Sequence, residues 1–249
     1  MKISIITIAY NSEETIEDTI KSVIDQDYSE IEYIIIDGGS KDGTLDIVER
    51  YKDQIAIIVS EPDKGIYDAM NKGVQRATGE LVGILNSDDI YAHKQVLSKV
   101  VDKIQEEKAD ALYADLVYVD REDTDKITRK WISGTYKSGQ FKKGWMPPHP
   151  TFFIRRDWYT KFGMYSTELK ISADYECMLR MIHKNHAKLA YLNEVITKMR
   201  VGGESNVSIK NRIKANKEDR LAWKMNGLKP GVFTSIRKPL SKIGQFLQK

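Results

Sequence analysis

The segment from Leu81 to Asp89 constrains this chain more than any other. Residues 81–85 are mostly apolar and predict a buried strand, which ends in a polar cluster carrying two adjacent carboxylates, Asp88 and Asp89. Carboxylates at the carboxyl end of a parallel strand lie where open α/β sheets bind ligands. Such oxygen-rich clusters suit Mg²⁺ or Mn²⁺, and these cations suit a diphosphate. An Asp-Asp pair is also common in solvated turns, so the rest of the chain must decide.

The first half of the chain alternates buried strands with amphipathic helices. Strands are predicted at 3–9, 31–36, 55–59 and 81–85, with helices between them. This order predicts right-handed crossovers and a parallel, Rossmann-like sheet. Polar residues follow all four strands: Tyr10, Asn11 and Glu13; Asp37 and Asp42; Glu61 and Asp63; Asn86, Asp88 and Asp89. Ordinary turn chemistry explains any one of these ends, but four converging ends predict a nucleotide-type crevice.

After Asp89 the pattern changes. A helix at about 94–107 precedes two alternating segments, 111–119 and 126–131, which predict antiparallel strands with one wet face. The expected fold class is therefore α/β with a mixed central sheet. A loop rich in Gly and Pro follows at 138–150, and a helix is predicted from about 171 to 186.

Composition excludes several classes of protein. A net charge of +3 over 249 residues gives no reason to expect nucleic-acid binding. The single cysteine, Cys177, excludes an internal disulfide and a cysteine-built metal site. No apolar run approaches the roughly 20 residues that span a bilayer, and the start of the chain reads as a strand, not as a signal peptide. We therefore expect a cytoplasmic protein.

The C-terminal region, 206–249, reads as a helical, basic, amphipathic extension. A helix is predicted at 208–226, and apolar residues recur at near-helical spacing among bases further on. Segment 229–249 is suited to contact an anionic membrane surface, which would place the protein on the inner face of the plasma membrane. The alternative is packing against the catalytic domain or a second subunit, and the sequence leaves a homo-oligomer open.

Five motifs together resemble glycosyltransferase family 2, which has the GT-A fold, and especially its bacterial members that assemble surface polysaccharides. They lie in order at 7–11 (TIAYN), 37–44 (DGGSKDGT), 61–73 (EPDKGIYDAMNKG), 86–89 (NSDD) and 173–176 (ADYE). The resemblance covers roughly residues 1–200. It implies a catalytic domain over 1–205, with a nucleotide-binding half at 1–90 and an acceptor-binding half at 91–205.

The resemblance implies inverting transfer of a sugar from a nucleotide diphosphate, most commonly UDP, to the hydroxyl of a saccharide or polyprenyl-linked saccharide. Asp89, with Asp88 beside it, would ligate Mn²⁺ or Mg²⁺, which offsets the charge on the leaving diphosphate. Asp88 would also lean toward the ribose. Asp174 would be the catalytic base, although on its own evidence it equally suits a helix N-cap.

Further roles follow from the same resemblance. Asp37 would hydrogen-bond the base. The other residues expected to bind the nucleotide are Thr7, Ala9, Tyr10, Asn11, Glu13, Ser40, Asp63, Lys64, Gly65, Asn71, Asn86 and Asp88. The residues expected to contact the acceptor are Trp145, His149, Tyr175 and Glu176.

The chain departs from the family pattern at Met70. Many relatives have an arginine here that steadies the diphosphate, and Lys64 or Lys72 would have to replace it. Two other functions suit these residues less well than sugar transfer. A catalytically silent subunit that binds a nucleotide sugar and regulates a partner transferase is the alternative. A nucleotidyltransferase ranks last, because the opening after the first strand is not Gly-rich and lacks Arg and Lys.

Overall fold

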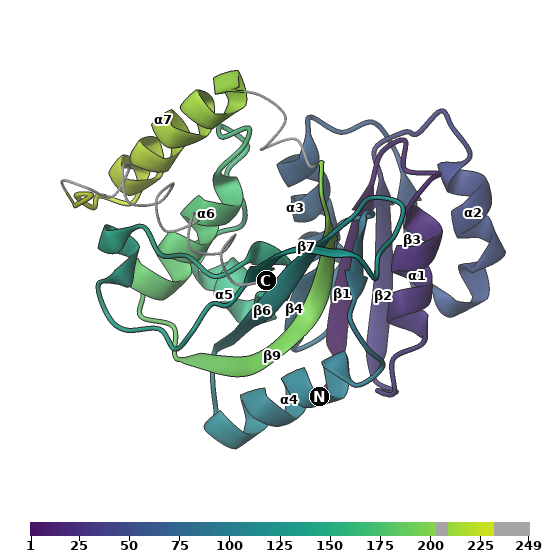
Figure 1. The fold of residues 1–249 in the computed structure, drawn as a ribbon, viewed down its shortest axis with the longest axis horizontal. Coiled ribbons are helices and arrows are strands. Elements are labelled where there is room, and N and C mark those ends of the chain that lie inside the picture. Colours follow the sequence, from purple (N-terminus) through teal and green to yellow (C-terminus); the bar gives the residue numbers. More distant parts are fainter. Residues whose placement is uncertain (203–208, 232–249) are drawn as a thin grey trace.

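The computed structural model describes residues 1–202 and 209–231. Within them, one mixed sheet lies between helices on both faces (Figure 1). Its strand order is β3-β2-β1-β4-β8-β6-β9-β5, with β7 paired to β6. The α/β class and the mixed sheet expected from the sequence are therefore confirmed.

The nucleotide-binding half is the parallel part of the sheet. It comprises β1 (Ile3–Ala9), α1 (Ile16–Ile24), β2 (Ile31–Asp37), α2 (Thr44–Arg50), β3 (Ile57–Ser60), α3 (Ile66–Arg76) and β4 (Leu81–Ile84). β1 pairs in parallel with both β2 and β4, and β2 with β3. The carboxyl ends of these strands consequently meet at one edge, as the sequence predicted.

The second half extends the sheet with mostly antiparallel pairs. It contains β5 (Asp89–Tyr91), α4 (Val96–Glu107), β6 (Ala111–Val119), β7 (Ile127–Trp131), β8 (Phe153–Arg155), α5 (Arg156–Phe162), α6 (Ala173–Met178), β9 (Leu189–Arg200) and α7 (Ile209–Met225). Short 3₁₀ turns at Gln140–Lys143 and His149–Thr151 interrupt the loop predicted at 138–150.

One expectation for this half was wrong, one was right only in part, and one strand was not predicted. β6 is buried along its whole length, because β9 pairs with it on one side and β8 and β7 on the other while α4 contacts it. The helix predicted at 171–186 is α-helical only to Met178 and continues as a π-helix, Leu179–Lys184. Strand β9 escaped prediction because its twelve residues mix charged and apolar side chains without clear alternation.

Alternate residues of β1 divide the core between the two faces. Ile3 and Ile5 pack in a cluster with residues of α1 and α4, whereas Ile6 and Ile8 pack in one with residues of α3, α6 and α7. These isoleucines are almost completely buried, and each contributes about 1.5–3 kcal/mol of hydrophobic free energy. The sheet is thus a rigid platform for the residues at its edge.

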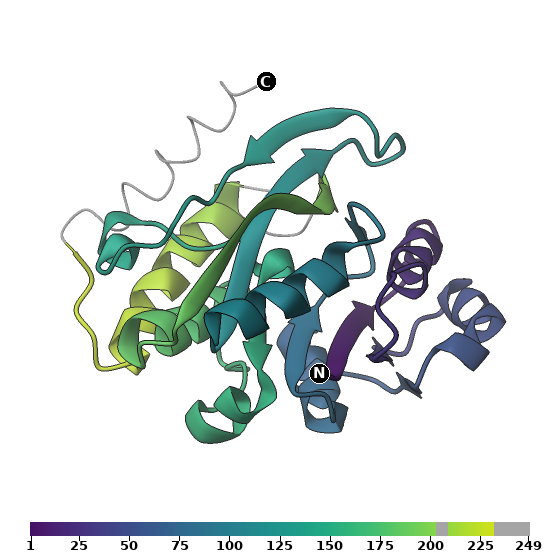
Figure 2. The same ribbon diagram turned by 90° about the horizontal axis from the view of Figure 1, so that it is seen from below.

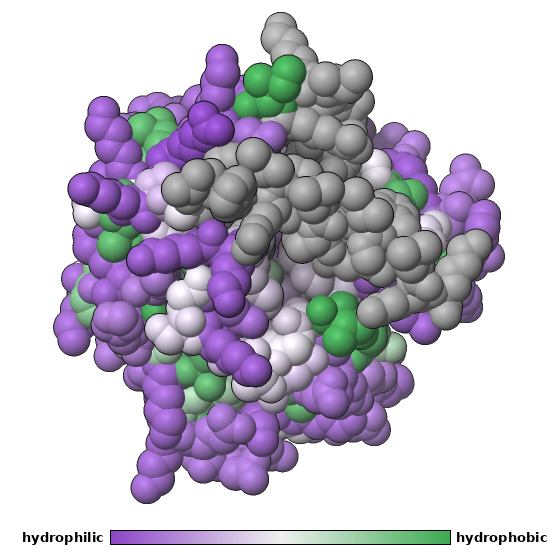
Figure 3. All heavy atoms as spheres, turned by 60° about the vertical axis from the view of Figure 1, so that its left-hand side comes forward, coloured by the Kyte–Doolittle hydropathy of each residue, from purple (hydrophilic) through white to green (hydrophobic). Residues whose placement is uncertain are grey.

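Helix α7 packs against α6, at the end of the molecule opposite α1 and α2 (Figures 1 and 2). Its Trp223 is only 1% exposed. The described part of the predicted extension is therefore docked on the catalytic domain. On the face drawn in Figure 3, described apolar side chains form small, separate patches among hydrophilic ones.

Helices within the described residues are too short or too polar to cross a bilayer. The amphipathic pattern at 232–249 lies outside the described residues. Membrane contact through 229–249 therefore stays a prediction.

Candidate active site

A continuous chain of side chains joins the end of β4 to the start of α6. The Nδ2 atom of Asn86 lies 3.1 Å from His149 Nε2 and donates to Asp89 Oδ2 at 3.2 Å. On its other side, His149 Nδ1 lies 3.6 Å from Asp174 Oδ2. Polar residues at the edge of the nucleotide half and the acid of the second half thus belong to one site.

Asp174 lies in the first turn of α6 and forms part of a small pocket. Its Oδ1 atom accepts a hydrogen bond from the Tyr67 hydroxyl at 3.2 Å. The pocket is lined by Met70, Ile84, His149, Phe152, Tyr165, Asp174 and Met178. The Asp174 side chain keeps 20% of its surface exposed, so it can accept a proton from a bound hydroxyl.

Burial shifts the pKa values of the two side chains that contact Asp174, His149 and Tyr67. It lowers the pKa of His149, and the nearby charges of Asp174 and Asp88 oppose this shift only in part. Burial also raises the pKa of Tyr67, with a smaller contribution from Asp174. At neutral pH the site therefore combines a neutral imidazole and a protonated phenol with the Asp174 carboxyl group.

Asp88 and Asp89 have different environments. Asp89 is fully buried, and burial together with the Asp88 charge raises the pKa of its carboxyl group well above the usual value. Asp88 is half-buried and close enough to act on the pKa of His149. The Oδ1 atom of Asp89 is buried without a hydrogen-bond partner and so offers an oxygen to a metal, and ligation of a metal by Asp89 stays a prediction.

Arg200, at the end of β9, fixes the position of Asp88. It is 3% exposed, and its Nη1 atom donates to the Asp88 carbonyl oxygen at 3.0 Å. Its other nitrogens bind the Arg121 carbonyl and the Asp18 carboxylate. Sequence reasoning missed Arg200 because it had not predicted β9, and a single arginine carried no other signal.

Asp37 does not occupy the base-binding role expected of it. The side chain is fully buried, and its two oxygens accept bonds from the amides of Gly39 and Ser40 and from the hydroxyls of Ser40 and Ser60. All of these partners belong to its own turn or to the end of β3. Asp37 therefore shapes the loop and has no acceptor left for a nucleotide base.

Asp63, and not Asp37, lies where it could bind the nucleotide base. A Cβ atom built on Gly38 would lie only 2.5 Å from Asp63 Oδ2 and 3.3 Å from the ring of Tyr10. The absent side chain at Gly38 thus makes room for the Asp63 carboxylate next to Tyr10, which is 62% exposed. In such an arrangement the carboxylate can hydrogen-bond to the edge of a base while the exposed aromatic ring stacks on its face.

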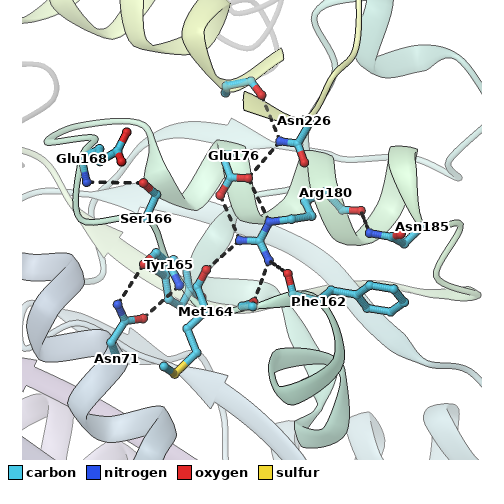
Figure 4. Close-up of polar contacts among 12 residues, drawn as sticks. Asn71, Phe162, Met164, Tyr165, Ser166, Glu168, Glu176, Arg180, Asn185 and Asn226 are labelled. Atoms are coloured by element: carbon cyan, nitrogen blue, oxygen red, sulfur yellow. Dashed lines mark hydrogen bonds and ion pairs between the residues drawn. The ribbon is translucent and has the colours of Figure 1, made fainter. Parts of the chain in front are cut away.

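Three other residues expected at the nucleotide are used internally. The Thr7 hydroxyl is buried 3.1 Å from the Tyr33 hydroxyl, and Ala9 lies in the core. Asn71 donates to the Tyr165 carbonyl at 2.8 Å and accepts from its N–H at 2.9 Å (Figure 4). With its amide occupied in both directions, Asn71 joins α3 to the loop before α6.

The remaining residues of the donor side shape two loops. Asn11 adopts a positive φ of 47°, receives Lys41 N–H on its Oδ1 atom and donates its own N–H to Ser40 Oγ. Glu13 accepts the N–H of Gly43 at 2.6 Å. These bonds connect the end of β1 to the loop after β2.

The loop before α3 has its own bonds. Gly65 has a φ of +116° and donates its N–H to Asp63 Oδ1 at 2.7 Å. Lys64 is exposed, whereas Lys72 binds the Pro62 carbonyl and Glu61. Of the two lysines considered as replacements for arginine at Met70, Lys64 is the one whose side chain extends into solvent.

Three of the four residues expected at the acceptor are structural. The Tyr175 hydroxyl is buried and accepts from Trp223, and Glu176 is 4% exposed and paired with Arg180. Trp145 donates its indole N–H to the Ser133 carbonyl, and its ring packs against Tyr113, Tyr136 and Phe141. His149 alone of the four lies beside Asp174.

The donor set fits a divalent cation that arrives with a diphosphate. Across residues 1–202 and 209–231, no group of three or more His, Cys, Asp or Glu side chains could form a closed metal cage. Mg²⁺ and similar ions are commonly held by one or two carboxylates plus substrate phosphates. Asp88 supplies one such carboxylate, and the Oδ1 atoms of Asp89 and Asn86, both buried without a hydrogen-bond partner, are further oxygens that could ligate a metal.

These features define a class. A parallel nucleotide-type half with an acid at its edge, connected through His149 to a second acid, fits a group-transfer enzyme. The model of glycosyl transferase family 2 matches residues 4–170, and the chain therefore belongs to that family of glycosyltransferases.

Two curated relatives are similar over part of their lengths. An uncharacterised glycosyltransferase of Mycobacterium tuberculosis is 32% identical over 186 residues, which cover 72% of this chain and 68% of the relative. TuaG of Bacillus subtilis, named as a teichuronic acid biosynthesis glycosyltransferase, is 39% identical over 107 residues, 42% of each chain.

Two solved structures share the fold. S. aureus TarS 1–349 in complex with UDP-GlcNAc has a TM-score of 0.72 at 21% identity, covering 99% of this chain and 72% of TarS. The mannosyltransferase PcManGT of Pyrobaculum calidifontis, in complex with GDP-Man and Mn²⁺, has a TM-score of 0.69 at 18% identity, covering 97% and 69%.

Proposed function

We propose that this chain is a metal-dependent, inverting glycosyltransferase that moves a sugar from a UDP-linked donor to an acceptor hydroxyl. The observation that carries the proposal is the connection from Asn86 through His149 to Asp174, which brings the donor-side edge and the proposed catalytic base into one site. The complexes of TarS with UDP-GlcNAc and of PcManGT with Mn²⁺ support the donor class and the cation.

On the donor side, Tyr10 stacks on the base and Asp63 accepts the N3–H of uracil. Asp88 would hold the cation, with Arg200 fixing its backbone, and Asp89 would add an oxygen that has no hydrogen-bond partner. A divalent cation bound there would offset the negative charge that develops on the leaving diphosphate.

On the acceptor side, Asp174 takes the proton from the attacking hydroxyl. Tyr67 holds one oxygen of its carboxylate, and His149 faces the other. A base on the wall opposite the leaving group suits attack from the back of the anomeric carbon, which inverts its configuration. The apolar residues Met70, Ile84 and Phe152 limit water around the reacting groups.

The acceptor we propose is a saccharide or lipid-linked saccharide of a bacterial surface polysaccharide. The name of TuaG, with its reference to teichuronic acid, supports this class. Membrane contact through 229–249 would bring a polyprenyl-linked acceptor to the site. Deletion of 229–249 followed by liposome co-sedimentation tests that contact, and unchanged sedimentation would reject it.

The test is a donor screen. The full chain is incubated with UDP-, GDP- and dTDP-sugars, with and without Mn²⁺, and release of the nucleoside diphosphate is measured. We expect metal-dependent release from a UDP-sugar that stops on chelation. Tight UDP binding without turnover of any donor, with or without saccharide acceptors, would instead support the silent regulatory subunit.

A further inference from the structure

Helix α7 supplies a carboxylate to the turn just before α6. Glu218 is 8% exposed, and its Oε2 atom accepts the N–H groups of Lys170 at 3.1 Å, Ile171 at 2.8 Å and Ser172 at 3.0 Å. One oxygen therefore holds three consecutive amides. Ser172 is the N-cap residue of α6, and Lys170 and Ile171 precede it, so Glu218 holds the turn that leads into the helix.

The turn that Glu218 holds leads directly into the proposed base. Ser172 occupies the N-cap position of α6 but makes no side-chain cap bond. The sequence alone left open that Asp174 caps its own helix. In the structure the Asp174 carboxylate contacts Tyr67 and His149, two residues after the last amide held by Glu218.

Two more residues, Trp223 of α7 and Asn226 just after its end, hold the next positions of α6. Trp223 Nε1 donates to the Tyr175 hydroxyl at 2.8 Å, and Asn226 Nδ2 donates to Glu176 Oε1 at 2.9 Å. Both partners follow Asp174 directly in the sequence. The α7 segment therefore contacts the chain on both sides of the proposed base.

The contact network continues beyond α6. Arg180 pairs with both oxygens of Glu176 and donates to the carbonyl groups of residues 162–164 (Figure 4). That loop is also held from α3 by the bonds between Asn71 and Tyr165. A displacement of α7 would consequently change the orientation of α6 relative to α3.

We propose that Glu218 is a positioning residue for the transfer reaction, which fixes the turn before α6 so that Asp174 faces the pocket. This inference rests on the proposed function, in which Asp174 accepts the proton. The contacts of Glu218 do not involve Tyr10, Asp63 or Asp88, so nucleotide binding should be independent of it.

A double-mutant cycle on the full chain tests the proposal. The assay is UDP release from a mixture of UDP-glucose, UDP-galactose and UDP-N-acetylglucosamine with Mn²⁺, water serving as acceptor, and UDP binding is measured by calorimetry. We expect Glu218→Ala to lower kcat at least ten-fold and to change the Kd for UDP less than three-fold. Glu218→Gln keeps one acceptor oxygen and should recover part of the loss.

The cycle separates positioning from general stability. If Glu218 acts through Asp174, Asp174→Asn combined with Glu218→Ala is no slower than Asp174→Asn alone. Leu221→Ala, on the exposed side of α7, and Glu32→Gln, which removes a buried amide-binding carboxylate at the opposite ends of the strands, are the controls. Both should keep kcat within two-fold once fully folded.

Three results would overturn the inference: a Glu218→Ala enzyme as fast as Leu221→Ala, a loss that merely follows the unfolded fraction, or losses that multiply with Asp174→Asn. A normal rate for Asp174→Asn itself would instead reject the base assigned under the proposed function, and this inference with it. A slow Asp174→Asn together with a normal Glu218→Ala rejects the inference alone.

Discussion

The Tyr67 hydroxyl donates a hydrogen bond to Asp174 across 3.2 Å, and so connects α3 of the nucleotide half to α6 of the acceptor half. Each residue belongs to one of the five sequence motifs, yet they are 107 positions apart. The bond holds the proposed base at one oxygen and leaves the other facing His149.

Loss of this bond should slow the reaction without weakening donor binding. A hydrogen bond of this kind contributes about 0.5–1.5 kcal/mol, and more when the partner is charged, so Tyr67→Phe should lower kcat about three- to ten-fold. Steady-state kinetics of UDP release measures it. A change confined to KM would show that Tyr67 acts on substrate binding instead.

Replacement of Asp88 or Asp89 by asparagine should weaken metal-dependent binding of UDP. Asp88→Asn removes the half-buried carboxylate at this edge, and Asp89→Asn removes a second carboxylate whose Oδ1 atom has no hydrogen-bond partner. Each variant should therefore weaken Mn²⁺-dependent binding of UDP at least ten-fold and leave metal-free binding unchanged. Calorimetry with UDP, with and without Mn²⁺, measures both, and a variant with the affinity of the parent would remove its residue from the metal site.

Asp63 should determine the preference for uracil. Its carboxylate can accept the N3–H of uracil but not the unprotonated N3 of cytosine, and a bond to a charged group contributes about 1.5–3 kcal/mol. Asp63→Asn should therefore reduce the preference for UDP over CDP about ten-fold or more. Equal preference in the variant and the parent would assign base recognition elsewhere.

Glu32 should make the stability of the folded chain depend on pH below about 4.5. Burial opposes its ionisation, but hydrogen bonds from Lys2, Ser4 and Thr78 outweigh that effect and lower its pKa to about 2. Because the folded pKa lies below the unfolded value, the stabilisation is complete above about pH 4.5 and is lost as the pH falls toward 2. Thermal melts of Glu32→Gln should show a lower Tm than the parent at pH 7 and a shrinking difference below pH 4.5. A constant difference would contradict this linkage.

The sequence predicted the parallel half and the edge where its strands meet, because buried β-branched runs and polar ends are local signals. It also named Asp174 and His149, whose side chains the structure places 3.6 Å apart. What it missed depended on distant partners. Asp37 and Asn71 match the family motifs, but their polar atoms are occupied by Ser60 and by Tyr165.

The contact between Glu218 and the turn before α6 could not be predicted from local patterns either. Glu218 binds amides 46 to 48 positions earlier in the chain, and no spacing rule relates it to Asp174. Arg200 was missed for the same reason, since its role depends on a hydrogen bond to the Asp88 carbonyl, 112 positions earlier in the chain. Residues that act through tertiary contacts appear only once the fold is known.

The most direct test of the account is the turnover of Asp174→Asn compared with its binding of UDP. Asparagine keeps the size of the side chain and a carbonyl oxygen that Tyr67 can bond, but it cannot accept the proton of the attacking hydroxyl. The account predicts UDP affinity within three-fold of the parent and a kcat for metal-dependent UDP release at least a hundred-fold lower. Near-normal turnover by Asp174→Asn would contradict it.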